Sequence, residues 1–221
     1  MFAYPEKSRY GRPLPKTKIF EKTGATSSMR KLFAAQVEQV IWEHKLAPDT
    51  VNLATSGGVQ EIQIMAVTLK TADLDFELLR GLDKAIAHPL FFELQHGNRR
   101  RLTAAFKRRH ETVSDEWVVG DYFQSAWVSG KALRQPLPLA LDLCTLYEAM
   151  LRTLMLRAKA GESLREQAER LARFRVAQVD MRQLEARLRR EKSFAKKVDL
   201  ERELRTFRKT WAFELASTTH I

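Results

Sequence analysis

The sequence predicts an α+β fold: an antiparallel sheet with helices on one face, followed by a C-terminal helical or coiled-coil hairpin. Three observations lead to this fold class. Several short runs between residues 51 and 127 alternate apolar and polar side chains, as half-buried strands do. Segments with helical spacing separate these runs without the regular strand–helix alternation of a parallel α/β fold. Leu164 to Leu215 contains neither Gly nor Pro, which favours long helices.

The chain divides into three expected parts. An N-terminal arm, residues 1–27, mixes prolines with basic residues, and this mixture opposes regular structure. The α+β domain is expected over residues 28–130. The helical and coiled-coil appendage is expected over residues 139–221, after the break at Pro136 and Pro138.

The first predicted elements are a helix and a hairpin. Apolar residues on one helical face predict a helix from Met29 to Leu46, closed by Pro48. Two β-prone runs, Val51–Thr55 and Val59–Lys70, flank a Ser-Gly-Gly sequence, which is typical of a hairpin.

The next elements are a second helix and a second hairpin. A helix is expected to begin at Asp73 or Asp75, whose side chains suit an N-cap, and to end before Pro89. Strands are expected at Leu90–Leu94, Arg101–Lys107 and Trp117–Trp127.

The appendage begins with an amphipathic helix, Leu139–Met155, whose apolar stripe is wide enough to be core. Ser163 and Glu166 then form a capping box that starts another helix. Two apolar seams follow, and they are out of phase across Glu191–Lys197. We therefore predict a hairpin of two helices, because one helix of about 50 residues would extend roughly 75 Å unsupported.

Composition and charge restrict the function. The 221 residues are 44% apolar and 29% charged, the balance of a folded chain. Lys and Arg number 38 against 27 Asp and Glu, and this excess favours an anionic partner such as nucleic acid. The single cysteine, Cys144, excludes an internal disulfide and a multi-thiolate metal site. No stretch resembles a leader or a membrane span, so we expect a cytoplasmic protein without a membrane partner.

Two basic clusters are candidate nucleic-acid contacts. The residues from Leu151 onward carry 18 Lys and Arg against 10 Asp and Glu, so most of the excess charge lies in the appendage. The candidates near its predicted tip are Arg187, Arg189, Arg190, Lys192, Lys196 and Lys197. The candidates on the predicted strand are Arg99, Arg100, Arg101, Lys107, Arg108 and Arg109.

Each cluster also has a purely structural interpretation. The flanks of coiled coils are ordinarily charged for solubility and pairing. Charges on a strand also protect a sheet edge from aggregation. Alternation along the strand puts Arg99 and Arg101 on one face and Arg100 on the other, so the second cluster is not one flat patch.

Common catalytic motifs are absent from the sequence. There is no Walker loop, no G-x-G-x-x-G after a strand and no G-x-S-x-G elbow. The sequence has five histidines: His44, His88, His96, His110 and His220. No two of them have the i, i+4 spacing of a helical zinc site. Cys144 lies in an apolar helix and is expected to be a buried small side chain. We therefore expect no catalytic residue, no metal and no cofactor.

One constellation supports an alternative, a metal-dependent nuclease of restriction type. Asp83 precedes Glu93-Leu94-Gln95 on a predicted strand, and two carboxylates converging on Mg²⁺ would suit such a site. The lysine that would polarise the attacking water is replaced by Gln95. Glu61-Ile62-Gln63 has the same replacement.

Several segments resemble an uncharacterised bacterial domain-of-unknown-function family. They are Lys16–Phe20, Ile41–Glu43 with Lys45–Leu53, Glu61–Ile64, Leu82–Ile86 with Pro89–Leu94, and Glu191–Leu200. The resemblance implies a gene encoded beside helicases and DNA methyltransferases of restriction-like or phage-defence clusters. It implies no catalytic residues, because the family has none assigned.

The expected function is a non-enzymatic accessory or adaptor subunit of a bacterial DNA-defence assembly. Its expected partner is a larger helicase or methyltransferase-type protein, with DNA as a candidate partner through the basic helical arm. The alternatives are the nuclease with Asp83 and Glu93, and a homo-oligomeric coiled-coil scaffold that binds no nucleic acid.

Overall fold

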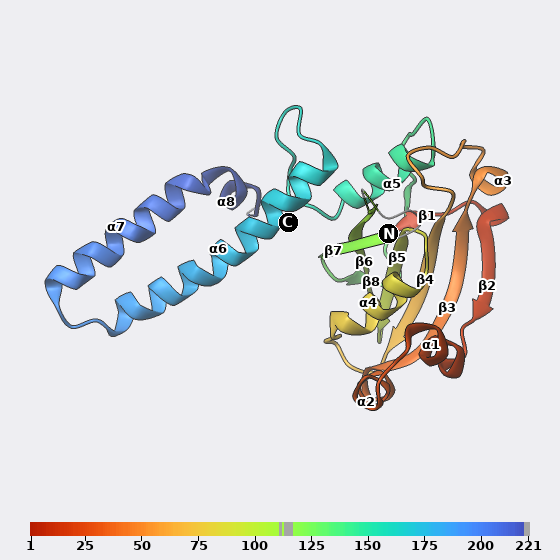
Figure 1. Cartoon of the computed structure of the whole chain (residues 1–221), viewed down its shortest axis with the longest axis horizontal. Coiled ribbons are helices and arrows are strands. Elements are labelled where there is room, and N and C mark those ends of the chain that lie inside the picture. The colour runs from red at the N-terminus through yellow and green to blue at the C-terminus, as the bar shows by residue number, and fades with distance from the viewer. Residues whose placement is uncertain (111, 113–116, 219–221) are drawn as a thin grey trace. The chain divides into compact units, whose positions relative to one another are not determined.

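The computed structural model describes residues 1–110, 112 and 117–218, so His220 lies outside the described residues. The chain forms two compact units, Met1–Met155 and Leu156–Ile221 (Figure 1). Each unit is built around its own packed side chains. Among the described residues, none of the helices combines the length and apolar character that crossing a bilayer requires.

A seven-stranded sheet organises the first unit. Its strands are β2 (Arg9–Pro13), β3 (Val37–Leu46), β4 (Ile62–Leu69), β5 (Leu90–His96), β6 (Arg99–Arg109), β7 (Trp117–Gln124) and β8 (Val128–Ser129). The order is β2-β3-β4-β5-β6-β7, with β8 also paired to β6. Every pair is antiparallel except β4 and β5, which are joined through helix α4 (Phe76–Ala85). The predicted α+β class is therefore confirmed.

Smaller elements complete this unit. The helices are η1 (Glu6–Ser8), α1 (Lys16–Thr23), α2 (Ser27–Gln36), α3 (Pro48–Val51) and α5 (Leu143–Arg152). Strand β1 (Phe2–Ala3) pairs in parallel with β9 (Gln135–Pro136). Helix α5, which was expected to belong to the appendage, lies in the first unit.

Helices pack on both faces of the sheet, whereas the sequence suggested helices on one face only. On one face, α1, α2 and α4 bury side chains such as Ile19, Phe33 and Leu79 against Phe92 of β5. The opposite face receives α5, whose Tyr147 makes an edge contact with Phe91, with ring centroids 6.1 Å apart. Because Phe91 and Phe92 are consecutive on β5, they point to opposite faces.

The predicted helix from Met29 to Leu46 is wrong in its second half. The helix ends at Gln36 and the chain continues directly as β3. Val37, Val40 and Ile41 are β-branched residues that fit a pleated surface, and Val37 and Val40 are buried in the core. Their helical spacing reflects where they pack and does not reflect helix formation.

Two further expectations are corrected. Val51–Thr55 is not a strand: Asn52 adopts a left-handed conformation with φ of 56°, and β4 pairs with β3 instead. Residues 1–27 are not an irregular arm, because β2 pairs with β3 and Ile19 of α1 enters the core. Pro13 is tolerated in β2 because this is an edge strand of the sheet.

Other elements agree with the sequence. Helix α4 is capped by Asp75, whose Oδ1 accepts from the Glu77 amide at 2.9 Å. Strands β5 and β6 form the expected hairpin around Gly97, which has a φ of 56°. A left-handed turn of this kind favours glycine.

The second unit is a helical hairpin formed by α6 (Leu164–Arg190) and α7 (Phe194–Thr210), followed by α8 (Ala212–Thr218). Figure 1 shows α6 and α7 side by side. They are antiparallel, because Phe174 packs on Trp211 with ring centroids 5.3 Å apart and Glu185 pairs with Arg208 at 3.6 Å. The predicted reversal within residues 191–197 is confirmed.

Candidate nucleic-acid interface

The tip of the helical hairpin, residues 187–197, gathers exposed cations. Within these eleven residues lie six cations and one acid, Glu191. The exposed cations are Arg187, Arg189, Arg190, Lys192, Lys196 and Lys197. The hairpin thus brings together at its tip all six candidate phosphate contacts that the sequence predicted for the appendage.

Glu191 is engaged in the turn itself. Its Oε1 accepts from the backbone amides of Lys192 at 2.9 Å and Ser193 at 2.8 Å. These backbone hydrogen bonds, with Lys196 and Lys197 nearby, hold the pKa of the Glu191 carboxyl below its ordinary value. Glu191 therefore stays ionised and shapes the reversal, while it offsets only one of the six cations.

The two ends of the turn differ in what they do to helix stability. Arg187, Arg189 and Arg190 occupy the last turn of α6, where the negative end of the helix dipole favours cations. Lys196 lies in the first turn of α7, which contains no acid, and there the dipole disfavours cations. Helix stability thus accounts for the arginines, whereas the lysines on the α7 side need another explanation.

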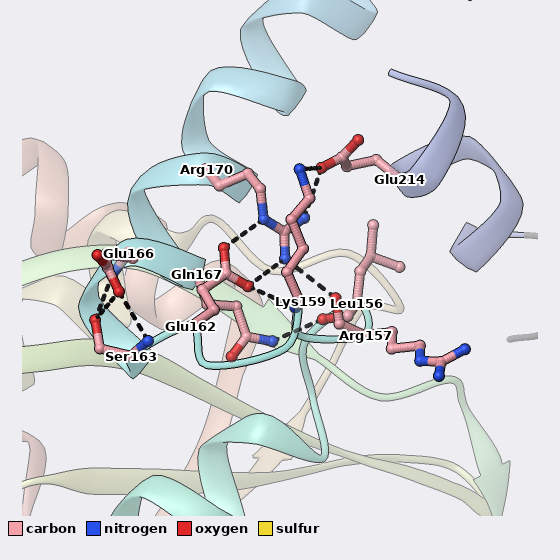
Figure 2. Close-up of polar contacts among 9 residues, drawn as sticks. All are labelled: Leu156, Arg157, Lys159, Glu162, Ser163, Glu166, Gln167, Arg170 and Glu214. Carbon is pink, nitrogen blue, oxygen red and sulfur yellow. Dashed lines mark hydrogen bonds and ion pairs between the residues drawn. The ribbon is translucent and has the colours of Figure 1, made fainter. Parts of the chain in front are cut away.

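A buried ion-pair cluster fixes the opposite end of the hairpin (Figure 2). The Arg170 guanidinium donates to both carboxylate oxygens of Glu162, at 2.6 and 2.8 Å, and to Glu214 of α8 at 2.8 Å. Lys159 lies 3.4 Å from the same Glu214 oxygen. Gln167 donates to the carbonyl of Leu156 at 2.7 Å. These contacts join α6, the preceding loop and α8 at the base of the hairpin.

The expectation that Lys107 contacts phosphates is corrected, because this side chain is buried in the first unit. Its side chain is 1% exposed, and its Nζ donates to the carbonyls of Asp83 at 2.5 Å and His88 at 2.8 Å, and to that of Ile86. These carbonyls lie in and just after the last turn of α4. Burial lowers the pKa of Lys107 to about 8. The lysine therefore supplies hydrogen-bond donors to the backbone carbonyls at the C-terminal end of α4.

The arginines of β6 face both sides of the sheet, as alternation predicts. Arg99 and Arg101 lie over the ring of Trp127, at 5.8 and 4.4 Å from its centroid. Arg100 donates instead to the carbonyl of Ala132 at 2.9 Å. The strand-edge interpretation is wrong, because β6 lies between β5 and β7 in the sheet.

The other end of β6 is held by different partners. Arg109 lies over the ring of Trp117, 5.6 Å from its centroid, and donates to the carbonyl of Gly58 at 3.4 Å. Arg108 donates to the carbonyl of Arg109 at 3.4 Å. The strand cluster is therefore dispersed over separate local contacts.

The two carboxylates of the nuclease alternative do not converge. Asp83 is a buried residue of the last turn of α4, where Tyr122 donates to it at 2.5 Å and burial raises its pKa to about 6. Glu93 lies on the other face of the sheet, in a bidentate pair with Arg134 at 2.7 and 2.8 Å. Glu61 pairs with Lys45 at 3.1 Å. The part of the chain that the structure describes contains no group of three or more His, Cys, Asp or Glu placed to hold a metal ion.

A polar pocket of about 510 Å³ lies over the sheet face opposite α4, and nothing in the sequence predicted it. Glu93, Arg134, Arg100 and His44 line it, together with Tyr4 from the N-terminal segment. These residues are far apart in the sequence and follow no motif. Arg134 also donates to the carbonyl of Phe2 at 2.7 Å, which ties the N-terminal segment to the pocket wall.

His44 carries a neutral imidazole in this pocket. The Ser8 hydroxyl donates its one proton to the carbonyl of Pro5 at 2.7 Å, so His44 Nδ1 must donate to Ser8 Oγ at 2.9 Å. His44 Nε2 is then the unprotonated nitrogen. Burial lowers the pKa of His44, which keeps the ring neutral at pH 7.

Cys144 is half-buried in α5, and burial raises the pKa of its thiol. A raised pKa reduces the thiolate fraction and therefore the reactivity of the sulfur. The side chain is half-buried, whereas the sequence suggested a buried one.

Comparisons with known proteins give one match. A family model described as "Domain of unknown function (DUF4391)" matches residues 2–210, which cover nearly all of the first unit and most of the second. Neither the curated proteins nor the solved structures gave a match.

Proposed function

Since the chain belongs to the DUF4391 family, a domain of unknown function, we propose its function from its own residues. The protein acts as a non-enzymatic accessory subunit of a DNA-processing defence assembly. The tip of its helical hairpin binds DNA phosphates, and the first unit docks a larger protein.

The placement of Lys196 and Lys197 carries the DNA-binding half of this proposal. Together with Lys192 they sit at the positive end of α7, opposite the arginines that end α6. Concentrating six cations around one acid is unfavourable in isolation, and an anionic partner relieves the repulsion. Phosphate contacts of this kind release counterions and give binding without base specificity.

The docking half of the proposal is supported by the loop between β8 and α5. Three of its leucines, Leu133, Leu139 and Leu141, are almost fully exposed. Exposed leucines of this kind are more typical of a protein interface than of a surface that binds phosphates. The helicase or methyltransferase identity of the partner rests on the segment resemblance alone.

The proposal is tested by measuring DNA association against salt concentration and by identifying proteins that co-purify with the chain. We expect the logarithm of the association constant to fall linearly with the logarithm of salt. Retention of a helicase or methyltransferase on the tagged protein would support the docking half. Absence of DNA association at about 50 mM salt would overturn the DNA-binding half.

A further inference from the structure

Phe194 is the first residue of α7 and is 82% exposed at the hairpin tip. The other rings of the hairpin are held by neighbours: Phe174 and Phe207 both contact Trp211. Within the described residues, the ring of Phe194 has no contact with another ring or a cation. The tip therefore presents a free aromatic face among its cations.

The chemistry around Phe194 restricts what the ring can bind. Lys192 and Lys196 flank it in the sequence, and both side chains are exposed. Burying Phe194 in an ordinary apolar pocket would also desolvate these ammonium groups, which is unfavourable. A fitting partner must offer a flat apolar face with anionic groups beside it. An unpaired nucleotide has both, namely the face of its base and its phosphates.

We propose that Phe194 stacks on an unpaired base while the cations of the tip contact the neighbouring phosphates. This inference rests on the proposed DNA binding and adds that the tip prefers single-stranded DNA to a duplex. In a duplex the base faces are already stacked, so Phe194 would first have to separate two base pairs.

A membrane surface is the competing class of partner, since basic residues beside an aromatic ring also suit anionic lipids. An interfacial helix, however, needs an apolar face along its length. In α7 the next large apolar residues on the inner face, Leu200 and Leu204, are buried within the hairpin. One ring at a tip matches a single stacked base better than a lipid layer.

The test uses the full chain with a fluorescently labelled oligo(dT), which forms no duplex, and a duplex of equal length. Phe194→Ala should weaken oligo(dT) binding by about 5- to 150-fold, the loss of one base–aromatic stack. Its salt dependence should not change, because no cation is removed. Duplex binding should change by less than about two-fold. Phe194→Trp should retain the affinity for oligo(dT), and its added emission should be quenched on binding.

A matched control is Val176→Ala, which truncates a 65% exposed apolar residue on α6. This variant should bind as wild type does. If Phe194→Ala binds oligo(dT) as wild type does, or loses duplex affinity equally, the stacking inference is wrong while the phosphate contacts stand. If wild type binds neither nucleic acid, the proposed function fails as well. Binding to phosphatidylglycerol vesicles in place of both would overturn both proposals.

Discussion

Arg170 and Glu214 are 44 residues apart in the sequence, yet their side chains form a 2.8 Å hydrogen-bonded ion pair at the base of the hairpin. The two side chains are only 7% and 1% exposed. The same guanidinium also donates to Glu162 and to the carbonyl of Arg157 at 3.1 Å. Helix α8 is therefore bound to the start of α6 by a buried charge cluster.

Removing the cation from this cluster should be costly. Arg170→Met leaves the carboxylates of Glu162 and Glu214 without their main partner, and breaking a buried pair in this way typically lowers the free energy of unfolding by about 3–5 kcal/mol. Urea unfolding followed by helical circular dichroism measures the loss. Arg165→Met is the control, since its pair with Glu169 is exposed on both sides and its removal should cost at most about 1 kcal/mol. Equal losses for the two variants would contradict the role of the cluster.

The apolar seam of α7 gives a second prediction. Leu204 is buried, and Trp211 packs on Phe174 and Phe207. Changing Leu204 and Trp211 together to Ser should lower the free energy of unfolding by a few kcal/mol. Because α6 covers this seam within one chain, the loss should be the same at every protein concentration. A wild-type unfolding midpoint that rises with concentration, with a folded monomeric double variant, would instead indicate an oligomer interface.

Asp83, a buried carboxyl group on α4, gives a prediction on pH. Burial raises the pKa of Asp83 to about 6, against the opposing attraction of Lys107. The folded state then binds the proton more tightly than the unfolded state. The stability contributed by Asp83 is thus present below its unfolded pKa and is lost as pH rises through about 6.

Asp83→Asn isolates this effect, because it cannot ionise and its side-chain oxygen can still accept from Tyr122. The unfolding free energy of wild type minus that of the variant should decrease between about pH 4 and pH 6. Urea titrations at several pH values measure it, and the other carboxylates cancel in the difference. A difference that grows with pH would mean that the ion pair with Lys107 outweighs burial.

Local signals in the sequence predicted some elements well and misled on others. Asp75, Gly97 and the Ser163–Glu166 capping box marked true ends of elements, because caps and turns depend on a few adjacent residues. Val37 and Val40 led to a wrong helix prediction, because the spacing of apolar residues does not distinguish a helix from a strand. The strand they form is stabilised by pairing with β4. The edge position of β2 depends on pairing with β3, which no local signal shows.

The same contrast applies to the sites. The six cations at the hairpin tip were found because they are close in sequence and one reversal gathers them. Lys107 was misassigned because nothing next to it shows that the carbonyl end of α4 lies over it. Arg134 and Glu93 were not paired in advance, since their meeting depends on the N-terminal segment that folds beside them.

The arginines at the end of α6 give the last prediction. Replacing Arg187, Arg189 and Arg190 with Ala should weaken DNA association and reduce the steepness of its salt dependence, by up to about 0.9 for each phosphate that is no longer neutralised. The matched control removes three exposed arginines elsewhere on α6: Arg165, Arg173 and Arg182. Fluorescence anisotropy across a salt series compares the two. If the cations serve only solubility, both variants should behave alike, because each removes the same charge. A larger loss for the tip variant would show that DNA is bound where the two helix ends meet, since only position distinguishes the two sets.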